Sequence, residues 1–420
     1  MRVGLIGGGT VGGGVCEILR TRGAHLAQQG AELQIVKICV RDVAKKRDFE
    51  IPAGCEVVGD PKSILEDDTI DMVVELMGGV TTAKDIIMAA IAKGKHVVTG
   101  NKALIAANLP ELQQAVKAVP AGSFSYEAAV CGGIPIIQTL KHDYVGDRVT
   151  SIMGIMNGTT NFMLSKMAIE GASYDDVLAE ATKLGYAESP PDFDVEGWDA
   201  RSKLAILCKL AFGVHVPEES IPCMGITRVS LEDFKYAHQM KCTVKLLGVA
   251  SMNPDGTLSA HVSTCMVHLT NQLSGVNGVL NCISVTSENL ATCVYSGPGA
   301  GRFATANSVV SDMAMVAKGG GRGDPFLFNT EIKVVPEVNG KFYIRFTVKD
   351  GIGIIATLGR LAMESQISID AILQVAIENP DQVPFVMTTD TTTLSAVNKL
   401  CAAFVKEPYC QEKPLVMPIM

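Results

Sequence analysis

The chain has 420 residues, of which 47% are hydrophobic and 19% charged, and its formal net charge is −8 at pH 7. This length exceeds what one hydrophobic core usually organises, so we expect two or three domains, and the composition excludes a disordered or fibrous protein. The acidic balance, without a cluster of Lys and Arg, argues against nucleic acid as a partner.

The first hundred residues alternate between short apolar runs and helical segments. Strands are predicted at residues 2–6, 33–40, 71–76 and 96–99, and helices at 15–20, near Ser63 and at 82–93. Such alternation indicates βαβ units and a parallel sheet. We therefore predict an α/β domain at residues 1–135 with a Rossmann-like, doubly wound sheet. Because a strand already starts at Arg2, we expect no signal peptide.

From residue 136 onward the segments become longer and mixed. Helices are predicted at 174–184 and 198–212, and strands at 244–250, 258–262 and 267–269. This pattern predicts a second, α+β domain with an open sheet at residues 136–325. Its glycine-rich end, residues 318–325, reads as a linker or loop.

The last eighty residues follow a βαββα pattern. Strands are predicted at 341–348, 368–375 and 385–389, and helices at 351–364 and 394–405. We expect a small separate module at residues 340–420. No apolar stretch in the chain reaches the roughly 20 residues that cross a bilayer, so we expect no membrane partner and a cytoplasmic protein.

A glycine motif, Gly7-x-Gly9-x-x-Gly12, lies directly between the first strand and the first helix. In a dinucleotide site the first glycine permits the tight turn, the second lets the backbone approach a pyrophosphate, and the third lets helix and strand pack closely. A purely structural glycine loop is the alternative. The context favours a dinucleotide site.

The end of the second strand decides between NAD and NADP in such domains. Here Arg41 is suited to a 2′-phosphate, and Asp42 to the free ribose hydroxyls. Basic residues follow at positions 45–47. NADP is favoured and NAD stays open; the alternative is that these charges form a solvated loop.

Two further stretches carry candidate chemistry. Lys102 follows the fourth strand, at the sheet edge that usually lines a ligand crevice. Farther on, Asp199 and Lys203 are four residues apart on a predicted helix, and Glu188 and Asp194 lie in the loop before it. One interpretation is that these residues form only an acidic loop and one helical ion pair, without a role in catalysis. A dehydrogenase, however, needs a group that exchanges the hydroxyl proton, and an ammonium substrate needs carboxylates.

The twelve cysteines include no close CxxC pair and no zinc-like spacing with histidine, so we expect reduced, mostly buried thiols. Cys131 lies in a glycine-rich loop, and it is the candidate for a reactive thiol.

Taken together, the chain resembles homoserine dehydrogenase. The resemblance rests on the opening glycines and on three later motifs in the right order, at residues 101–104, 157–161 and 185–204. It implies NAD(P)-dependent interconversion of L-homoserine and L-aspartate 4-semialdehyde, with Lys203 as the acid/base and Lys102 as a second active-site lysine. The substrate-binding residues that it implies are Glu188, Asp199, Asp194, Gly158, Thr159 and Tyr186. The cofactor-binding residues that it implies are Gly7, Gly9, Thr10, Val11, Gly12, Arg41, Lys102, Gly185, Glu188, Gly299 and Gly301.

The resemblance also implies a monovalent cation, such as Na⁺, bound largely through carbonyl oxygens. The matching residues are Glu127, Val130, Gly132 and Ile134. Residues 297–325 resemble the family segment that returns to the nucleotide domain, although residues 304–306 lack the usual proline.

The C-terminal module resembles an ACT-type βαββαβ regulatory domain through residues 348–356, but Ile352 stands where a proline is usual. Threonine as an effector and a structural or dimerising role are both open. The resemblance implies a homodimer or homotetramer, with residues 136–325 serving catalysis and dimerisation.

Two other functions compete with this one. A related oxidoreductase acting on another amino-acid aldehyde or imine would share the glycines but not the motif from Glu188 to Lys203. A nucleotide-sensing regulator without activity would not need Lys102, Asp199 and Lys203.

Overall fold

The computed structural model describes residues 1–187, 190–375 and 379–420, and the chain forms two compact units. Unit 1 contains residues 1–152, 202–220 and 281–332, and unit 2 contains residues 153–201, 221–280 and 333–420. Throughout the described residues, no helix combines the length and apolar character that a membrane span requires.

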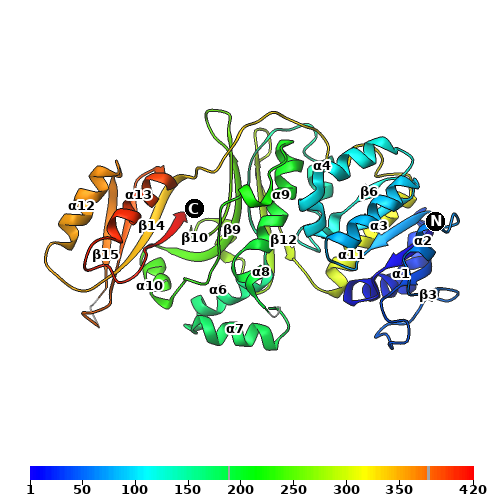
Figure 1. Ribbon diagram of the computed structural model, residues 1–420, viewed down its shortest axis with the longest axis horizontal. Helices are drawn as coiled ribbons and strands as arrows, with labels where there is room; N and C mark the ends of the chain where they lie inside the picture. The colour runs from blue at the N-terminus through cyan, green and yellow to red at the C-terminus, as the bar shows by residue number, and fades with distance from the viewer. Residues whose placement is uncertain (188–189, 376–378) are drawn as a thin grey trace. The chain divides into compact units, whose positions relative to one another are not determined.

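Unit 1 is built on a six-stranded parallel sheet with the order β3-β2-β1-β4-β5-β6. Its strands are β1 (Arg2–Ile6), β2 (Gln34–Cys39), β3 (Glu56–Val58), β4 (Met72–Glu75), β5 (His96–Thr99) and β6 (Phe124–Ser125). This is the doubly wound order of dinucleotide-binding domains, and it confirms the predicted Rossmann-like sheet. Most residues of these strands are apolar and buried, because helices cover the sheet (Figure 1).

Among the described residues, six α-helices lie wholly within unit 1. They are α1 (Thr10–Gln28), α2 (Lys62–Leu65), α3 (Thr81–Ala92), α4 (Lys102–Ala118), α5 (Ile136–His142) and α11 (Arg302–Ala317). A side chain at Gly14 of α1 would lie 2.8 Å from the Arg302 carbonyl oxygen, so this glycine lets α11 pack closely against α1. Helix α4 was not among the predicted elements. Pro110 lies inside it, Asn108 has φ −130°, and the helix resumes after that kink.

The glycine-rich segment at residues 318–325 is a loop anchored to unit 1, not a free linker. The Tyr126 hydroxyl donates to the Pro325 carbonyl at 2.8 Å, and Asp324 pairs with Lys117 at 2.8 Å. The next residue, Phe326, is fully buried and packs on Phe124 and Tyr126. Side chains just beyond the glycines therefore fix this stretch.

Six further elements of the described chain have residues in unit 1, and three of these elements also have residues in unit 2. The shared elements are β7, α9 and β11, and the sheet order at this end is β12-β11-β7. The bounds are η1 (Glu127–Ala129), β7 (Val149–Ile155), α9 (Trp198–Phe212), η2 (Glu218–Ser220), β11 (Leu280–Ser287) and β12 (Ala291–Pro298).

Unit 2 is centred on the long antiparallel pair β9 (Cys242–Met252) and β10 (Leu258–His268). The prediction of separate strands at 258–262 and 267–269 was wrong. β10 is one strand, since it pairs with β9 over its whole length and buries Ser263 and Thr264 along with its apolar residues. A polar interruption in the sequence is therefore not a break in the strand.

Short helices and strands complete the first part of unit 2. They are α6 (Gly158–Glu170), α7 (Tyr174–Lys183), α8 (Asp192–Val195), β8 (Cys223–Met224), α10 (Leu231–Gln239), η3 (Gln272–Gly275) and β13 (Val334–Val335).

The C-terminal residues of unit 2 form a βαββαβ motif with the strand order β18-β14-β16-β15, each pair antiparallel. Its elements are β14 (Asn339–Val348), α12 (Ile354–Glu364), β15 (Ile369–Gln374), β16 (Val383–Thr389), β17 (Thr392–Thr393), α13 (Leu394–Phe404) and β18 (Leu415–Ile419). The predicted βαββα pattern is confirmed, and β18 adds the final strand. β18 also pairs with β10, so the sheet of this motif continues that of unit 2.

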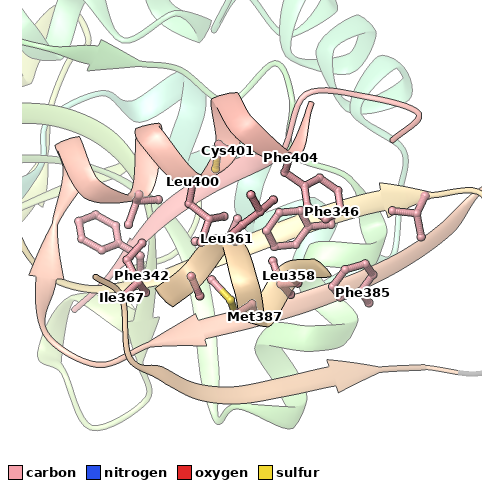
Figure 2. Close-up of a cluster of buried hydrophobic side chains, with 14 of the residues drawn as sticks. Phe342, Phe346, Leu358, Leu361, Ile367, Phe385, Met387, Leu400, Cys401 and Phe404 are labelled. Atoms are coloured by element: carbon pink, nitrogen blue, oxygen red, sulfur yellow. The ribbon is translucent and has the colours of Figure 1, made fainter. Parts of the chain in front are cut away.

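The two faces of β14 bury different residues, because side chains alternate along a strand. Phe342 and Phe346 point into an apolar core with Leu358 of α12 and Phe404 of α13 (Figure 2). The intervening Arg345 pairs with Asp233 of α10 at 2.8 Å. The hydroxyl of Tyr343 donates to the same carboxylate, also at 2.8 Å.

Candidate functional site

The first glycines of the chain form the turn between β1 and α1. Gly7 has φ +107°, and a Cβ there would lie 2.5 Å from the Leu76 carbonyl oxygen. A Cβ at Gly12 would lie 2.0 Å from the Gly7 carbonyl oxygen. Both positions therefore exclude any side chain, which is the close packing that the motif predicts.

Gly9 differs from its neighbours, since a Cβ there would meet nothing within 4 Å. Gly9 is the N-cap of α1, no side chain caps this helix, and its first turn, which starts with Thr10 and Val11, has no acidic residue. Open space before an uncapped helix N-terminus suits an anion.

At the end of β2, Arg41 and Asp42 are both exposed. One oxygen of the Asp42 carboxylate accepts the backbone N–H groups of Ala44 at 3.0 Å and Lys45 at 3.2 Å. Asp42 thus stabilises its own turn, and Arg41 is exposed beside it.

Lys102 is the first residue of α4 and is half-buried. The preceding Asn101 caps the helix by accepting the Leu104 N–H at 3.2 Å, and its side-chain nitrogen donates to the Gly79 carbonyl at 2.7 Å. The turn that carries Lys102 is therefore tied to the turn after β4.

In unit 2 the structure brings two of the predicted carboxylates together through Asn157. Its side-chain amide nitrogen donates hydrogen bonds to the carboxylates of Asp194, at 2.7 Å, and Asp199, at 2.8 Å. Its amide oxygen caps α6 by accepting the Thr160 N–H at 2.8 Å. Two neighbouring carboxylates favour a bound cation, such as an ammonium group.

The first turn of α6 carries Gly158 and Thr159. The Thr159 hydroxyl donates to the Tyr186 carbonyl at 2.7 Å, and the Tyr186 ring packs edge-on against Phe162 with 5.1 Å between centroids. Gly185 precedes Tyr186 with φ +75°. The predicted residue Glu188 lies outside the described residues.

Helix α9 carries both Asp199 and Lys203, as predicted. They are 3% and 7% exposed, so both ionisable side chains are buried, and their spacing of four residues puts them on one side of the helix. Asp and Lys side chains are rarely buried unless they are paired or have a function.

The predicted cation-binding residues lie in a buried loop of unit 1. The Glu127 carboxylate accepts the Ile137 N–H at 2.9 Å and the Gln138 N–H at 2.7 Å. Burial, followed by the nearby Asp312 carboxylate, raises the pKa of Glu127 to about 7. Val130 and Ile134 are buried beside it.

The same loop packs closely on the segment before α11. A Cβ at Gly132 would lie 2.5 Å from the Gly299 carbonyl oxygen, and Gly301, with φ +113°, caps α11. Cys131 is fully buried and has φ +53°, so its thiol is not presented on the surface. Among the described residues, no three or more His, Cys, Asp and Glu side chains converge on a metal position.

Asn157 was not predicted to contribute to the site. In the sequence it stands only within the motif at residues 157–161, whereas in the structure it lies between β7 and α6 and caps α6. Its link to the two aspartates depends on the fold.

Comparison with known proteins gives consistent matches. A family model described as "Homoserine dehydrogenase" matches residues 135–314, and one described as "Homoserine dehydrogenase, NAD binding domain" matches residues 7–122. A homoserine dehydrogenase from Bacillus subtilis is 36% identical over 390 residues, covering 91% of this chain and 89% of that protein. One from Corynebacterium glutamicum is 36% identical, covering 97% of this chain and 92% of that protein.

Solved structures agree. The crystal structure of a homoserine dehydrogenase from Thiobacillus denitrificans is 34% identical, with a TM-score of 0.93, covering all of this chain and 98% of that one. A hyperthermophilic archaeal homoserine dehydrogenase in complex with NADPH is 26% identical, with a TM-score of 0.60, covering 75% of this chain and 96% of that one.

Proposed function

This chain belongs to the homoserine dehydrogenase family, and from that premise we propose how its residues divide the reaction between them. It is an NAD(P)-dependent oxidoreductase that interconverts L-homoserine and L-aspartate 4-semialdehyde, in the pathway towards threonine, methionine and isoleucine. Such a reaction moves a hydride and a proton, so its residues must bind a dinucleotide, orient the substrate and exchange the proton.

We assign the dinucleotide to the turn after β1 and the first turn of α1. The open space at Gly9 and the uncapped helix N-terminus fit a pyrophosphate. When bound, the dinucleotide supplies the hydride acceptor for the alcohol or, in reverse, the hydride donor for the aldehyde. The residues assigned to it are Gly7, Gly9, Thr10, Val11, Gly12, Arg41, Lys102, Gly185, Glu188, Gly299 and Gly301.

Lys203 is the proposed acid/base. Oxidation of the alcohol removes a hydride from carbon and a proton from the hydroxyl, and the neutral amine of Lys203 takes that proton; in reduction the ammonium returns it. Lys203 is buried on α9, one helical turn from Asp199, and a lysine is seldom buried unless it is paired or functional, which supports this role. Lys102, at the N-terminus of α4, is the second active-site lysine.

The observation that carries the substrate assignment is the pair of carboxylates held by Asn157. Asp199 and Asp194 attract the homoserine ammonium, and the Asn157 amide keeps both oriented. The full set of proposed substrate residues is Glu188, Asp199, Asp194, Gly158, Thr159 and Tyr186.

The preferred dinucleotide is proposed to be NADP. Arg41 is exposed at the end of β2, and an oxygen of Asp42 is engaged in its own turn. The archaeal relative in complex with NADPH is consistent with that preference. Absorbance of the reduced nicotinamide, followed with L-homoserine and each dinucleotide in turn, measures it.

For this measurement the informative variant is Arg41→Ser. It should lower kcat/KM for NADP about tenfold and change kcat/KM for NAD little, because a charge-assisted bond to the 2′-phosphate is lost. Equal losses with both dinucleotides would remove Arg41 from the assignment.

A monovalent cation, such as Na⁺, is proposed at Glu127, Val130, Gly132 and Ile134. The donor set is one carboxylate with backbone carbonyls, which suits a hard cation. Nearby, Asn281 is 1% exposed, its amide lies against Gly299, and neither polar atom of that amide has a hydrogen-bond partner in the described chain. Activity and melting temperature measured in sodium, potassium and a bulky organic cation test this site.

The βαββαβ motif is proposed to be an ACT-like regulatory module with threonine as its effector. Its strand order supports the ACT resemblance. If millimolar threonine leaves the kinetics of the enzyme unchanged, the module has a structural or dimerising role instead.

A homodimer or homotetramer is proposed, and light scattering decides between them. The twelve cysteines are all free thiols, which supports a reducing, cytoplasmic location.

A further inference from the structure

Glu75 is a buried carboxylate that belongs to none of the proposed binding sites. It is the last residue of β4, lies between β1 and β5 in the parallel sheet, and has 0% exposure. The rest of this strand is apolar. Burial of a carboxylate is unfavourable unless hydrogen bonds compensate it, so its partners indicate what it does.

The partners of Glu75 come from two different turns. One carboxylate oxygen accepts the backbone N–H groups of Met77 at 2.8 Å and Gly78 at 3.2 Å. The other oxygen accepts the hydroxyl of Thr99 at 2.7 Å. Every partner is a donor, which an ionised carboxylate satisfies with both oxygens. Burial raises the pKa of Glu75, and these hydrogen bonds oppose the rise.

A second set of hydrogen bonds closes the ring. The hydroxyl oxygen of Thr99 accepts the Asn101 N–H at 3.0 Å, and the Asn101 amide nitrogen donates to Gly79 at 2.7 Å. Glu75 therefore connects the turn after β4 to the turn after β5, and Lys102 is the next residue of the second turn.

The turn after β4 has little other support. Gly78 and Gly79 have φ values of +73° and +76°, and a Cβ at either position would meet nothing within 4 Å. Both are exposed. Two successive left-handed glycines restrict their own backbone little, so the conformation of this turn depends on the hydrogen bonds that Glu75 and Asn101 make to it.

We propose that Glu75 is a positioning residue for hydride transfer: its carboxylate sets the geometry of residues 77–79 and 99–102 at the carboxyl edge of the sheet, and thereby orients Lys102. Ligands of open α/β sheets bind outside this edge. The inference rests on the proposed function in one respect, namely the role of Lys102 in the active site.

The main test is Glu75→Gln. The amide has one accepting oxygen, so it cannot serve both the N–H groups of residues 77–78 and the Thr99 hydroxyl. We expect kcat to fall about tenfold, the KM for homoserine to change less, and the isotope effect with homoserine deuterated at the alcohol carbon to rise. Wild-type kcat and isotope effect in this variant would overturn the proposal, whatever its melting temperature.

Thr99 provides a matched pair that leaves Glu75 intact and keeps the test valid if Glu75→Gln does not fold. Thr99→Val removes the hydroxyl and should lower kcat in the same direction, whereas Thr99→Ser keeps the hydroxyl and should restore it. A purely structural role would lower the melting temperature of Thr99→Val and leave kcat of the folded enzyme unchanged, which also overturns the proposal.

Lys102→Met separates this inference from the assignment on which it rests. If Glu75 acts through Lys102, adding Glu75→Gln or Thr99→Val to Lys102→Met lowers kcat no further. Additive losses would show that Glu75 does not act through Lys102. Wild-type activity of Lys102→Met alone would instead remove the proposed role of that lysine.

Discussion

The two units present their candidate binding groups in different ways. The pyrophosphate position proposed in unit 1 is formed by backbone, namely a glycine turn and an uncapped helix N-terminus. The position proposed in unit 2 for the substrate ammonium is formed by side chains, with Asn157 orienting Asp194 and Asp199. A backbone site depends on space, so an added methyl group should damage it. A side-chain site depends on charge and orientation, so the loss of a hydrogen bond should damage it.

The largest effect on activity is expected from Lys203→Met. Lys203 lies on α9, the helix that also carries Asp199. Removal of an acid/base typically lowers kcat by about 10²–10⁴-fold. Steady-state kinetics in both directions measure it. Lys183→Met, at an exposed position on α7, is the control and should leave kcat unchanged. Full homoserine oxidation by Lys203→Met would show that the proposed acid/base is wrong.

Gly9→Ala tests the backbone site of unit 1. The added methyl group does not clash with the protein, since nothing lies within 4 Å of its position. The φ of Gly9 is −90°, which alanine also adopts. We therefore expect a normal melting temperature with a KM for the dinucleotide raised about tenfold or more, because the methyl group occupies the space assigned to the pyrophosphate.

Gly23→Ala is the control for that variant. It lies in the same helix, also with nothing within 4 Å, and should stabilise the protein by about 0.5–1 kcal/mol without changing this KM. An unchanged KM in Gly9→Ala would place the pyrophosphate elsewhere.

Asn157→Ala tests the side-chain site of unit 2. It removes both hydrogen bonds to Asp194 and Asp199, and we expect the KM for homoserine to rise about tenfold as the carboxylates separate. It also removes a helix cap, so Ser173→Ala, which removes the cap of α7, is the matched control. The two variants should lose similar stability, about 1 kcal/mol, but only Asn157→Ala should change the KM. If both variants have the same KM for homoserine, Asn157 acts only as a helix cap.

The smallest effect concerns stability in acid. Burial lowers the pKa of His261, on β10, from 6.5 to about 4. Between these values the unfolded chain binds a proton that the folded chain does not, so stability falls as the pH falls through this window and is unaffected above it. The loss amounts to at most about 3 kcal/mol.

His261→Gln should therefore flatten the decrease in melting temperature between about pH 7 and about pH 5. His238→Gln, at an exposed position on α10, should leave the slope as it is. Parallel slopes for wild type and His261→Gln would mean that the pKa of His261 is the same in the folded and unfolded chains.

Several elements were predictable from sequence because their signals are local. The strand at Arg2–Ile6, the strand at His96–Thr99 and the helix at Trp198–Phe212 appear with the predicted bounds. Each has a strong period or is flanked by clear turn residues. The helix at Lys102–Ala118 was missed because Pro110 is a local signal against a helix, which the packing of its buried Leu104, Leu109 and Leu112 overrides.

By itself, the sequence determined the glycine turn between strand and helix, the spacing of Asp199 and Lys203, and the order of motifs that identifies the family. The first two depend on residues close together in the chain, and the third needs only the order of local motifs along it. Only the tertiary structure decided that Asn157 would join two aspartates 37 and 42 residues away, and that Glu75 would meet Thr99, 24 residues away. Such hydrogen bonds depend on the register of strands and the packing of helices, and no local pattern of residue types records them.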